Sequence, residues 1–502
     1  MILAITASPL AIQPANAVSA GSKCAKVGGQ SQSGVKIFVC SKSGKALVWK
    51  LKSISGAQTS KPTYTQATYP WATPCDEDSF VDSVWKPIQA YLKRIGYCEA
   101  PLTFVPATLE SPGPTKAISA DSTLIDLKAC KLINQRTSGQ FTGFPNPYEL
   151  NTFNERRHPG PNTKFQVIAV ETNDSAKADK SPAQEYGHYF DYLKKTLEYL
   201  SDGSSNVTFS VPDKYTKMDV NLESYGIGWH GYPTPSGQKF FDAAVKAVDA
   251  EVDFANVNMA LLIIPGKSKA SLLGSQPWGS GVSAEGEVKH ILSLDPLSGL
   301  NELHREYTML HPLVVLHELY HAGLGLDDHY GDQVSLFSPE VGMGHWGLMN
   351  TSKSDLLTWE KWLVGFTMDS QVRCASPSTE STHWLVPTGV KSTKPKLLVV
   401  PVSSTKAVVI ESIRSVGINF KLPVRSEGAL VYTVDTAELR HGYGISLVAT
   451  PFPKFVPATP SDPMVGSTAP LKAGQHVDIY GLRVEVQEAG KFGDVISISK
   501  AD

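Results

Sequence analysis

The sequence predicts an α+β protein in which helices pack on a mixed sheet, followed by a β-rich C-terminal domain. Apolar runs of strand length at 164–174 and 258–266 alternate with segments of helical periodicity at 183–200 and 237–254. After residue 374, short Val-rich runs are separated by Gly, Pro and Ser, which is typical of a β-sandwich. The two patterns succeed each other along the chain, which indicates two consecutive folded units.

The first unit is expected to contain the order strand, helix, helix, strand, helix. The run at 164–174 is β-rich and ends in turn residues, so it predicts a buried strand. In the segment 183–200, Tyr186, Phe190, Leu193 and Leu197 recur on one helical stripe. This order implies a mixed sheet with helices packed on it.

The N-terminus is predicted to be an export signal. Residues 1–17 are mostly apolar or small and end in Ala-Asn-Ala, a signal-peptidase pattern, although no Lys or Arg precedes Lys23. No later apolar run reaches the ~18–20 residues that a membrane-spanning helix needs. We therefore expect a secreted, extracellular protein without a transmembrane segment.

The six cysteines are expected to form disulfides, because their number is even and the chain is predicted to be exported. None belongs to a C-x-x-C pair. The expected pairs are Cys24–Cys40, which closes a small loop, and then Cys75–Cys98 and Cys130–Cys374.

Composition divides the chain into six segments. These are a signal peptide (1–17), a small disulfide-closed module (18–53), a linker (54–70), an N-terminal accessory or propeptide-like region (71–164), the unit with the mixed sheet (165–375) and the β-rich domain (376–502). The formal net charge of −2, without a long run of one sign, argues against nucleic acid or an anionic membrane surface as a partner.

The stretch LHELYHAGLGLDDHY (316–330) carries the main chemical signal. Pro312 suits the first turn of a helix, and Gly323 or Gly325 would end it. His317 and His321 are four residues apart, so their side chains lie on the same helix face. With Glu318 between them they form H-E-x-x-H, which supplies two zinc ligands and a carboxylate that can accept a proton from water.

A catalytic zinc needs a third protein ligand. The metzincin pattern H-E-x-x-H-x-x-G-x-x-H would place it ten residues after His317, where this chain has Asp327 and not His, and the glycine is also displaced. Asp328, Asp327 and His329 are the alternatives. The Gly-rich stretch GSGVSAEG (279–286) lacks a P-loop lysine and is interpreted as a loop that does not bind phosphate.

The segment LGLDDHY resembles the L-G-L-P-D-x-Y segment of snapalysin and of immune inhibitor A-type metallopeptidases. The resemblance extends over about residues 165–502 and includes GMGHWGLMN (342–350), which is similar to that family's G-x-W-x-L-M segment. It implies that Asp328 is the third ligand and that Met349 forms a supporting turn beneath the zinc, with Trp346 nearby. It also implies one extra residue between His321 and Gly325, which Gly323 would absorb as a bulge at the helix end.

These observations lead us to expect a metzincin-like, secreted zinc metalloendopeptidase that acts on extracellular proteins or peptides. His317, His321 and Asp328 would hold Zn²⁺, Glu318 would be the general base, and Ca²⁺ near Asp327 or Asp332 is a second, structural candidate cofactor. The alternative is a decayed peptidase that acts as a secreted adhesin or surface-binding protein. In either case the non-catalytic domains are candidates for attachment to a cell surface or cell wall.

Overall fold

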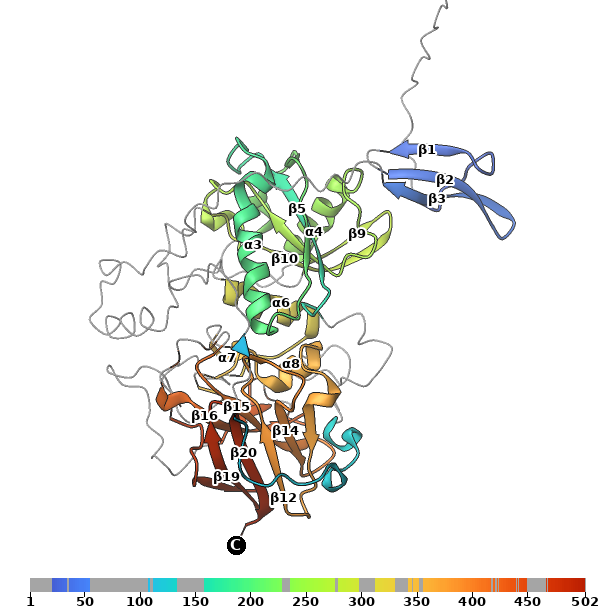
Figure 1. Ribbon diagram of the computed structural model, residues 1–502. Coiled ribbons are helices and arrows are strands. Elements are labelled where there is room, and N and C mark those ends of the chain that lie inside the picture. Colours follow the sequence, from blue (N-terminus) through green and yellow to red (C-terminus); the bar gives the residue numbers. More distant parts are fainter. Residues whose placement is uncertain are drawn as a thin grey trace, which may run out of the picture.

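The computed structural model describes residues 20–33, 36–54, 107–108, 112–132, 158–227, 235–275, 279–297, 312–329, 342–344, 346–351, 355–416, 419, 422, 424–438, 440, 442–448, 466 and 468–501. The predicted signal peptide, residues 55–70 of the linker and the pair Cys75–Cys98 lie outside these ranges. Among the described helices, none combines the length and apolarity that crossing a membrane requires. Figure 1 shows the mixed sheet above the sandwich, with helices α6, α7 and α8 between them.

The N-terminal module is a three-stranded antiparallel sheet. Its strands β1 (Gln30–Ser33), β2 (Lys36–Ser43) and β3 (Ala46–Ile54) follow each other in space as they do in sequence. The predicted disulfide Cys24–Cys40 is confirmed, and Phe38 is buried beside it. A sheet this small has little apolar core, so the disulfide supplies much of its stability.

The first large sheet is mixed, as predicted. It has the order β6-β5-β8-β10-β9, and the short strand β7 also pairs with β5. Strands β5, β6, β8 and β10 are parallel, whereas β9 is an antiparallel edge strand. The bounds are β5 (Lys164–Glu171), β6 (Thr208–Ser210), β7 (Thr216–Lys217), β8 (Met259–Ile263), β9 (Gly279–Ser283) and β10 (Gly286–Ser293).

Two features of this sheet differ from the sequence expectation. The Gly-rich stretch 279–286 is not a loop, because it forms β9 and the turn into β10. Gly279 and Gly281 are needed there, since a Cβ atom at either position would overlap helix α4 (Pro235–Val248). That helix also ends at Val248, before the predicted end at residue 254.

Helices cover both faces of the mixed sheet. Phe165, Val167 and Ala169 of β5 share one apolar cluster with α3 (Pro182–Leu200) and α6 (Pro312–Leu324). The alternate residues Ile168 and Val170 belong to a second cluster with α4. Burial on both faces explains the uninterrupted apolar runs of β5 and β8, because a one-sided sheet would show alternation.

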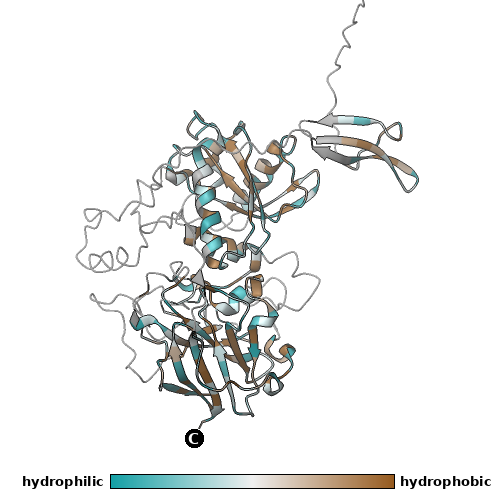
Figure 2. Ribbon diagram, in the orientation of Figure 1, coloured by the Kyte–Doolittle hydropathy of each residue, from teal (hydrophilic) through white to brown (hydrophobic). Residues whose placement is uncertain are grey.

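The C-terminal part contains two sheets. One has the order β11-β14-β15-β16-β17 and the other β12-β20-β19-β18. They enclose an apolar cluster that includes Leu398, Val408 and Val431 from the first sheet and Val484 and Ile496 from the second, as expected of a β-sandwich (Figure 2). The bounds are β11 (Val372–Cys374), β12 (Ser381–Leu385), β14 (Leu397–Pro401), β15 (Lys406–Ile413), β16 (Gly428–Asp435), β17 (Ile445–Leu447), β18 (His476–Ile479), β19 (Leu482–Gly490) and β20 (Gly493–Lys500).

The boundary predicted between residues 375 and 376 does not separate two cores. Strand β11 already belongs to the five-stranded sheet, so this sheet begins at Val372. Its outer face, with Val399, Val409 and Tyr432, continues the apolar cluster of α6 and α8 (Thr358–Val364). One face of the sandwich and the helix that carries the H-E-x-x-H motif therefore belong to the same apolar cluster.

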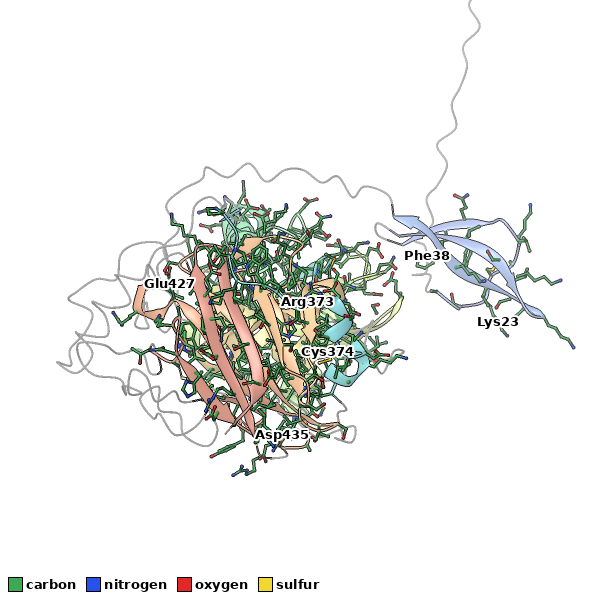
Figure 3. All side chains as sticks on the ribbon, turned by 60° about the horizontal axis from the view of Figure 1, so that its bottom comes forward. Lys23, Phe38, Arg373, Cys374, Glu427 and Asp435 are labelled. Carbon is green, nitrogen blue, oxygen red and sulfur yellow. A yellow bond between two sulfur atoms is a disulfide. The ribbon has the colours of Figure 1, made fainter. Side chains whose placement is uncertain are left out.

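Residues 107–108 and 112–132 of the predicted accessory region lie on the sandwich, whereas residues 158–164 belong to the unit with the mixed sheet. Strand β4 (Ala107–Thr108) pairs in parallel with β13 (Val390–Lys391), and the N–H groups of Thr115 and Lys116 donate to Glu488. The predicted disulfide Cys130–Cys374 is confirmed, and Figure 3 shows Cys374 and Arg373 beside this segment. Residues 107–108 and 112–132 are thus joined to the C-terminal part by hydrogen bonds and by one disulfide.

Candidate metal centre

Helix α6 presents the two motif histidines on one face. It begins at Pro312 and ends before Gly325, which adopts a left-handed conformation (φ 68°) and donates its N–H to the carbonyl of His321 at 3.0 Å. Leu316, Leu319 and Tyr320 are buried and anchor the helix in the core. The rings of His317 and His321 lie 4.5 Å apart, centroid to centroid.

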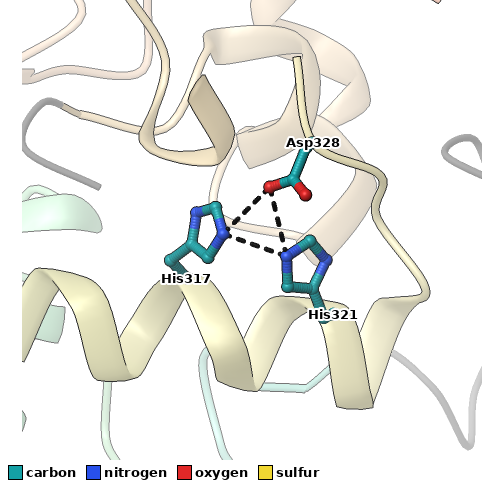
Figure 4. Close-up of side chains that lie close together, drawn as sticks. All are labelled: His317, His321 and Asp328. Atoms are coloured by element: carbon teal, nitrogen blue, oxygen red, sulfur yellow. Dashed lines mark hydrogen bonds and ion pairs between the residues drawn. The ribbon is translucent and has the colours of Figure 1, made fainter. Parts of the chain in front are cut away.

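Asp328 returns to these histidines after the turn at Gly325. Its Oδ1 atom lies 3.1 Å from Nε2 of His317 and 3.4 Å from Nε2 of His321, and the two Nε2 atoms are 2.9 Å apart (Figure 4). All three side chains are buried. Among the described residues, this is the group of His, Cys, Asp and Glu side chains whose donor atoms converge closely enough to hold one metal ion.

Backbone carbonyls fix the orientation of both rings. Nδ1 of His317 lies 3.0 Å from the carbonyl oxygen of Leu348, and Nδ1 of His321 lies 2.6 Å from that of Leu326. A carbonyl oxygen can only accept, so each Nδ1 carries the hydrogen and each neutral ring directs the lone pair of Nε2 toward Asp328. Two such lone pairs at 2.9 Å repel each other unless a proton or a metal ion lies between them.

The electrostatics of the cluster favour positive charge. Burial lowers the pKa of His317, but the hydrogen bond to Asp328 and the charges of Glu318 and Asp328 outweigh burial and raise this pKa to about 9. Burial raises the pKa of Asp328, yet its contacts with the two histidines hold it well below the ordinary range. Two imidazoles and one carboxylate in this arrangement fit the ligand set of zinc.

The two rival ligands have other contacts. Oδ2 of Asp327 accepts the N–H of Gly442 at 2.9 Å, and Nε2 of His329 lies 2.8 Å from Oε1 of Glu360. Both residues are buried, but neither belongs to the converging group. Asp327 therefore ties the loop after α6 to residue 442, and Asp332, the other acid considered for calcium, lies outside the described residues.

The expectation for Gly323 was wrong. Helix α6 continues through Leu324 without a bulge at Gly323, and it is Gly325 that adopts the left-handed conformation. Gly323 is needed for a different reason: a Cβ atom there would lie 2.0 Å from the carbonyl oxygen of His158. The sequence shows a glycine at position 323, but only the tertiary structure shows that the segment at His158 packs against it.

Met349 lies in the short helix α7 (Leu348–Thr351), directly after the carbonyl that orients His317. It is fully buried, and its carbonyl oxygen accepts the N–H of His329 at 2.9 Å. Trp346 belongs to the same apolar cluster and donates Nε1–H to the carbonyl of Gly466 at 2.9 Å. This segment supports the site through its backbone, a contribution that side-chain patterns in the sequence do not reveal.

Glu318 lies next to the cluster and is half-buried. Its charge acts on His317 and also on Asp295, an acid that follows β10. Burial raises the pKa of Asp295 to about 7. The charge of Glu318 also raises this pKa, whereas hydrogen bonds from Ser275 lower it. Sequence reasoning missed Asp295, although an acid directly after a buried strand is a recognisable signal.

A second polar group lies in the same core and is called the buried ionic cluster: Asp202, Asp355, Lys361, Lys396 and Glu411. Lys361 pairs with Asp355 at 2.6 Å, Lys396 pairs with Asp202, and Glu411 accepts the N–H of Thr358 at 3.0 Å. A cavity of about 10 Å³ between Asp355 and Glu411 is about the size of one water site. This cluster was also not predicted, because its members are spread over 210 positions of the chain.

The comparisons with known proteins do not identify a family: no protein-family model matches the chain, and no curated protein matches it either.

Proposed function

We propose that the chain is an exported zinc metalloendopeptidase. The observation that carries the proposal is the convergence of the Nε2 atoms of His317 and His321 on Asp328, with each ring held by a backbone carbonyl. When bound, zinc supplies Lewis acidity, which polarises a peptide carbonyl and makes water a stronger acid. The two disulfides support export, since such bonds persist in oxidising compartments.

Each residue of the site would have a separate role in catalysis. His317, His321 and Asp328 bind the metal and leave one side for substrate. Glu318, half-buried and next to His317, accepts the proton of the attacking water and returns it to the leaving amine. Proteins or peptides are the proposed substrates, because the resemblance to immune inhibitor A-type peptidases rests on the same residues.

We also propose that residues 165–375 form a metzincin-like peptidase domain. The mixed sheet with one antiparallel edge strand and the histidine-bearing helix packed on its face support this assignment. The decayed-peptidase alternative drew on the displaced glycine, but close packing against the carbonyl of His158 gives Gly323 a structural reason to be glycine. All three candidate ligands and Glu318 are present.

The proposal is tested by casein cleavage with zinc content measured in parallel. Wild type is compared with Glu318→Gln and with Glu198→Gln, a half-buried glutamate on helix α3 that serves as the matched control. We expect about one zinc per chain in all three proteins. Glu318→Gln is expected to cleave about 100- to 10,000-fold more slowly, because only proton transfer is removed.

Two results would contradict the proposal. Wild type that binds zinc but cleaves none of a mixture of unfolded proteins would favour the binding-protein alternative. Equal rates for wild type and Glu318→Gln would remove Glu318 from the mechanism.

A further inference from the structure

The N-terminal module differs in charge from the rest of the chain. Residues 18–54 contain no Asp, Glu or Arg, whereas the remainder has 39 basic and 48 acidic residues. The module contains seven lysines: Lys23, Lys26, Lys36, Lys42, Lys45, Lys50 and Lys52. Because it has no carboxylate side chain, none of these lysines can form an ion pair within the module.

The lysines whose side chains are described are exposed: Lys23, Lys26, Lys42, Lys45 and Lys50. Lys42 and Lys45 flank the turn between β2 and β3, and Lys26 lies in the loop before β1. The charges are thus distributed over several segments of the module and do not converge on one pocket. Such a distribution suits an extended ligand better than a small one.

Strand register places two of the lysines on one face. Lys23 lies opposite Val48, and Lys50 is two residues further along the same strand. Because opposite residues share a face and successive residues alternate, Lys23 and Lys50 point to one side of the sheet. Cys40 and Trp49 lie opposite each other on the other side, which the disulfide closes, and Lys42, opposite Leu47, belongs to that side too, so lysines lie on both faces (Figure 3 labels Lys23).

We propose that residues 18–54 bind a linear phosphodiester polymer of a cell envelope. Lysine is a flexible point charge that attracts phosphate without fixed geometry, and the module has no arginine for bidentate recognition. Membrane insertion would need exposed large apolar side chains beside the lysines, and Val27 is the one found among the described residues of the module. A flexible polyanion with repeated charges meets these conditions.

This inference does not depend on the proposed peptidase activity. The Ser-, Thr- and Pro-rich segment 55–70 follows the module directly. Binding through the module would hold the rest of the chain, which is acidic overall, at an anionic surface. The polymer is the ligand of the module and not a substrate.

The test measures binding of the full chain to immobilised poly(glycerol phosphate) at about 50 and 200 mM salt. Five lysine contacts on a flexible chain predict that affinity falls about 100-fold between these salt concentrations. A variant with Lys23, Lys42, Lys45 and Lys50 all changed to Gln retains one of the five contacts, so its affinity should fall only about 3-fold over the same range and be much weaker at 50 mM.

The matched control changes four exposed lysines outside the module, Lys214, Lys217, Lys267 and Lys289, to Gln. It should bind like wild type. Resistance of Cys24 and Cys40 to alkylation shows that the disulfide of the module has formed in each variant, and an unchanged circular dichroism spectrum shows that the fold is kept.

Three outcomes would overturn the proposal. These are no binding of wild type at 50 mM salt, equal losses in the two quadruple variants, and binding to phosphatidylglycerol vesicles but not to the polymer.

Discussion

The candidate metal centre and the buried ionic cluster are two polar groups in one core, and they balance charge differently. In the ionic cluster, each lysine has a carboxylate partner, Lys361 with Asp355 and Lys396 with Asp202. In the metal centre, two ring nitrogens and a carboxylate oxygen converge, and positive charge must come from a proton or a metal ion. Burial of charge is costly in both groups. The ionic cluster is neutralised by the protein's own lysines, whereas the candidate metal centre needs a bound proton or metal ion.

Leu348 connects the two groups. Its carbonyl oxygen orients His317, and its N–H donates to the carbonyl of Asp355 at 2.9 Å. The ionic cluster therefore fixes the segment that orients His317, a candidate metal ligand. If this comparison is correct, changes in the metal centre should alter metal affinity most, and changes in the ionic cluster should alter stability most.

The largest effect is expected from Asp328→Ala. Protein zinc sites bind with roughly 10–16 kcal/mol, so loss of one of three protein ligands should weaken zinc binding at least about 1,000-fold. Asp327→Ala, one residue away, should change zinc affinity by less than about 10-fold, because Asp327 contacts Gly442. Competition with a fluorescent zinc chelator measures both affinities, and the reverse order would make Asp327 the ligand.

The next effect concerns Lys361→Met, which leaves Asp355 buried without its partner. The free energy of unfolding should fall by about 3–5 kcal/mol, and the double variant Lys361→Met/Asp355→Leu should recover most of it. Urea denaturation measures both. Lys246→Met is the control, because its ion pair with Asp242 lies on the surface and should contribute less than about 1 kcal/mol. An effect of Lys361→Met no larger than the control would show that the ionic cluster carries little stability.

A smaller effect is expected in the pH dependence of stability. Burial raises the pKa of Glu411 to about 7, and hydrogen bonds from Thr358 only partly oppose it. The folded state then binds more protons than the unfolded state between the ordinary pKa and about 7, so stability falls as pH rises through this range. Glu411 should account for a loss of about 3 kcal/mol between pH 4.5 and 8.

Glu411→Gln should remove the contribution of Glu411 to the fall in the free energy of unfolding, as measured by urea denaturation at pH 5 and pH 8. Glu485→Gln, a half-buried position on β19, should leave the decline unchanged. A decline of the same size in wild type and Glu411→Gln would mean that Glu411 is ionised in the folded protein at pH 5.

The sequence by itself determined the features that depend on near neighbours in the chain. Helical and strand periodicity located α3, β5 and β8, because each pattern is set by one backbone geometry. The spacing of His317 and His321 placed two candidate ligands on one helix face for the same reason. The pairs Cys24–Cys40 and Cys130–Cys374 were predicted by pairing cysteines in an apparently exported chain, although the second joins residues 244 positions apart.

Only the tertiary structure decided what depends on distant segments. It placed Asp328, and not Asp327 or His329, beside the histidines, because the turn at Gly325 and the contacts with Gly442 and Glu360 orient three adjacent side chains differently. It joined residues 107–108 and 112–132 to the C-terminal sheets, and it linked the two predicted domains through one shared apolar cluster. These outcomes follow from packing and hydrogen bonding across the chain, which no local pattern encodes.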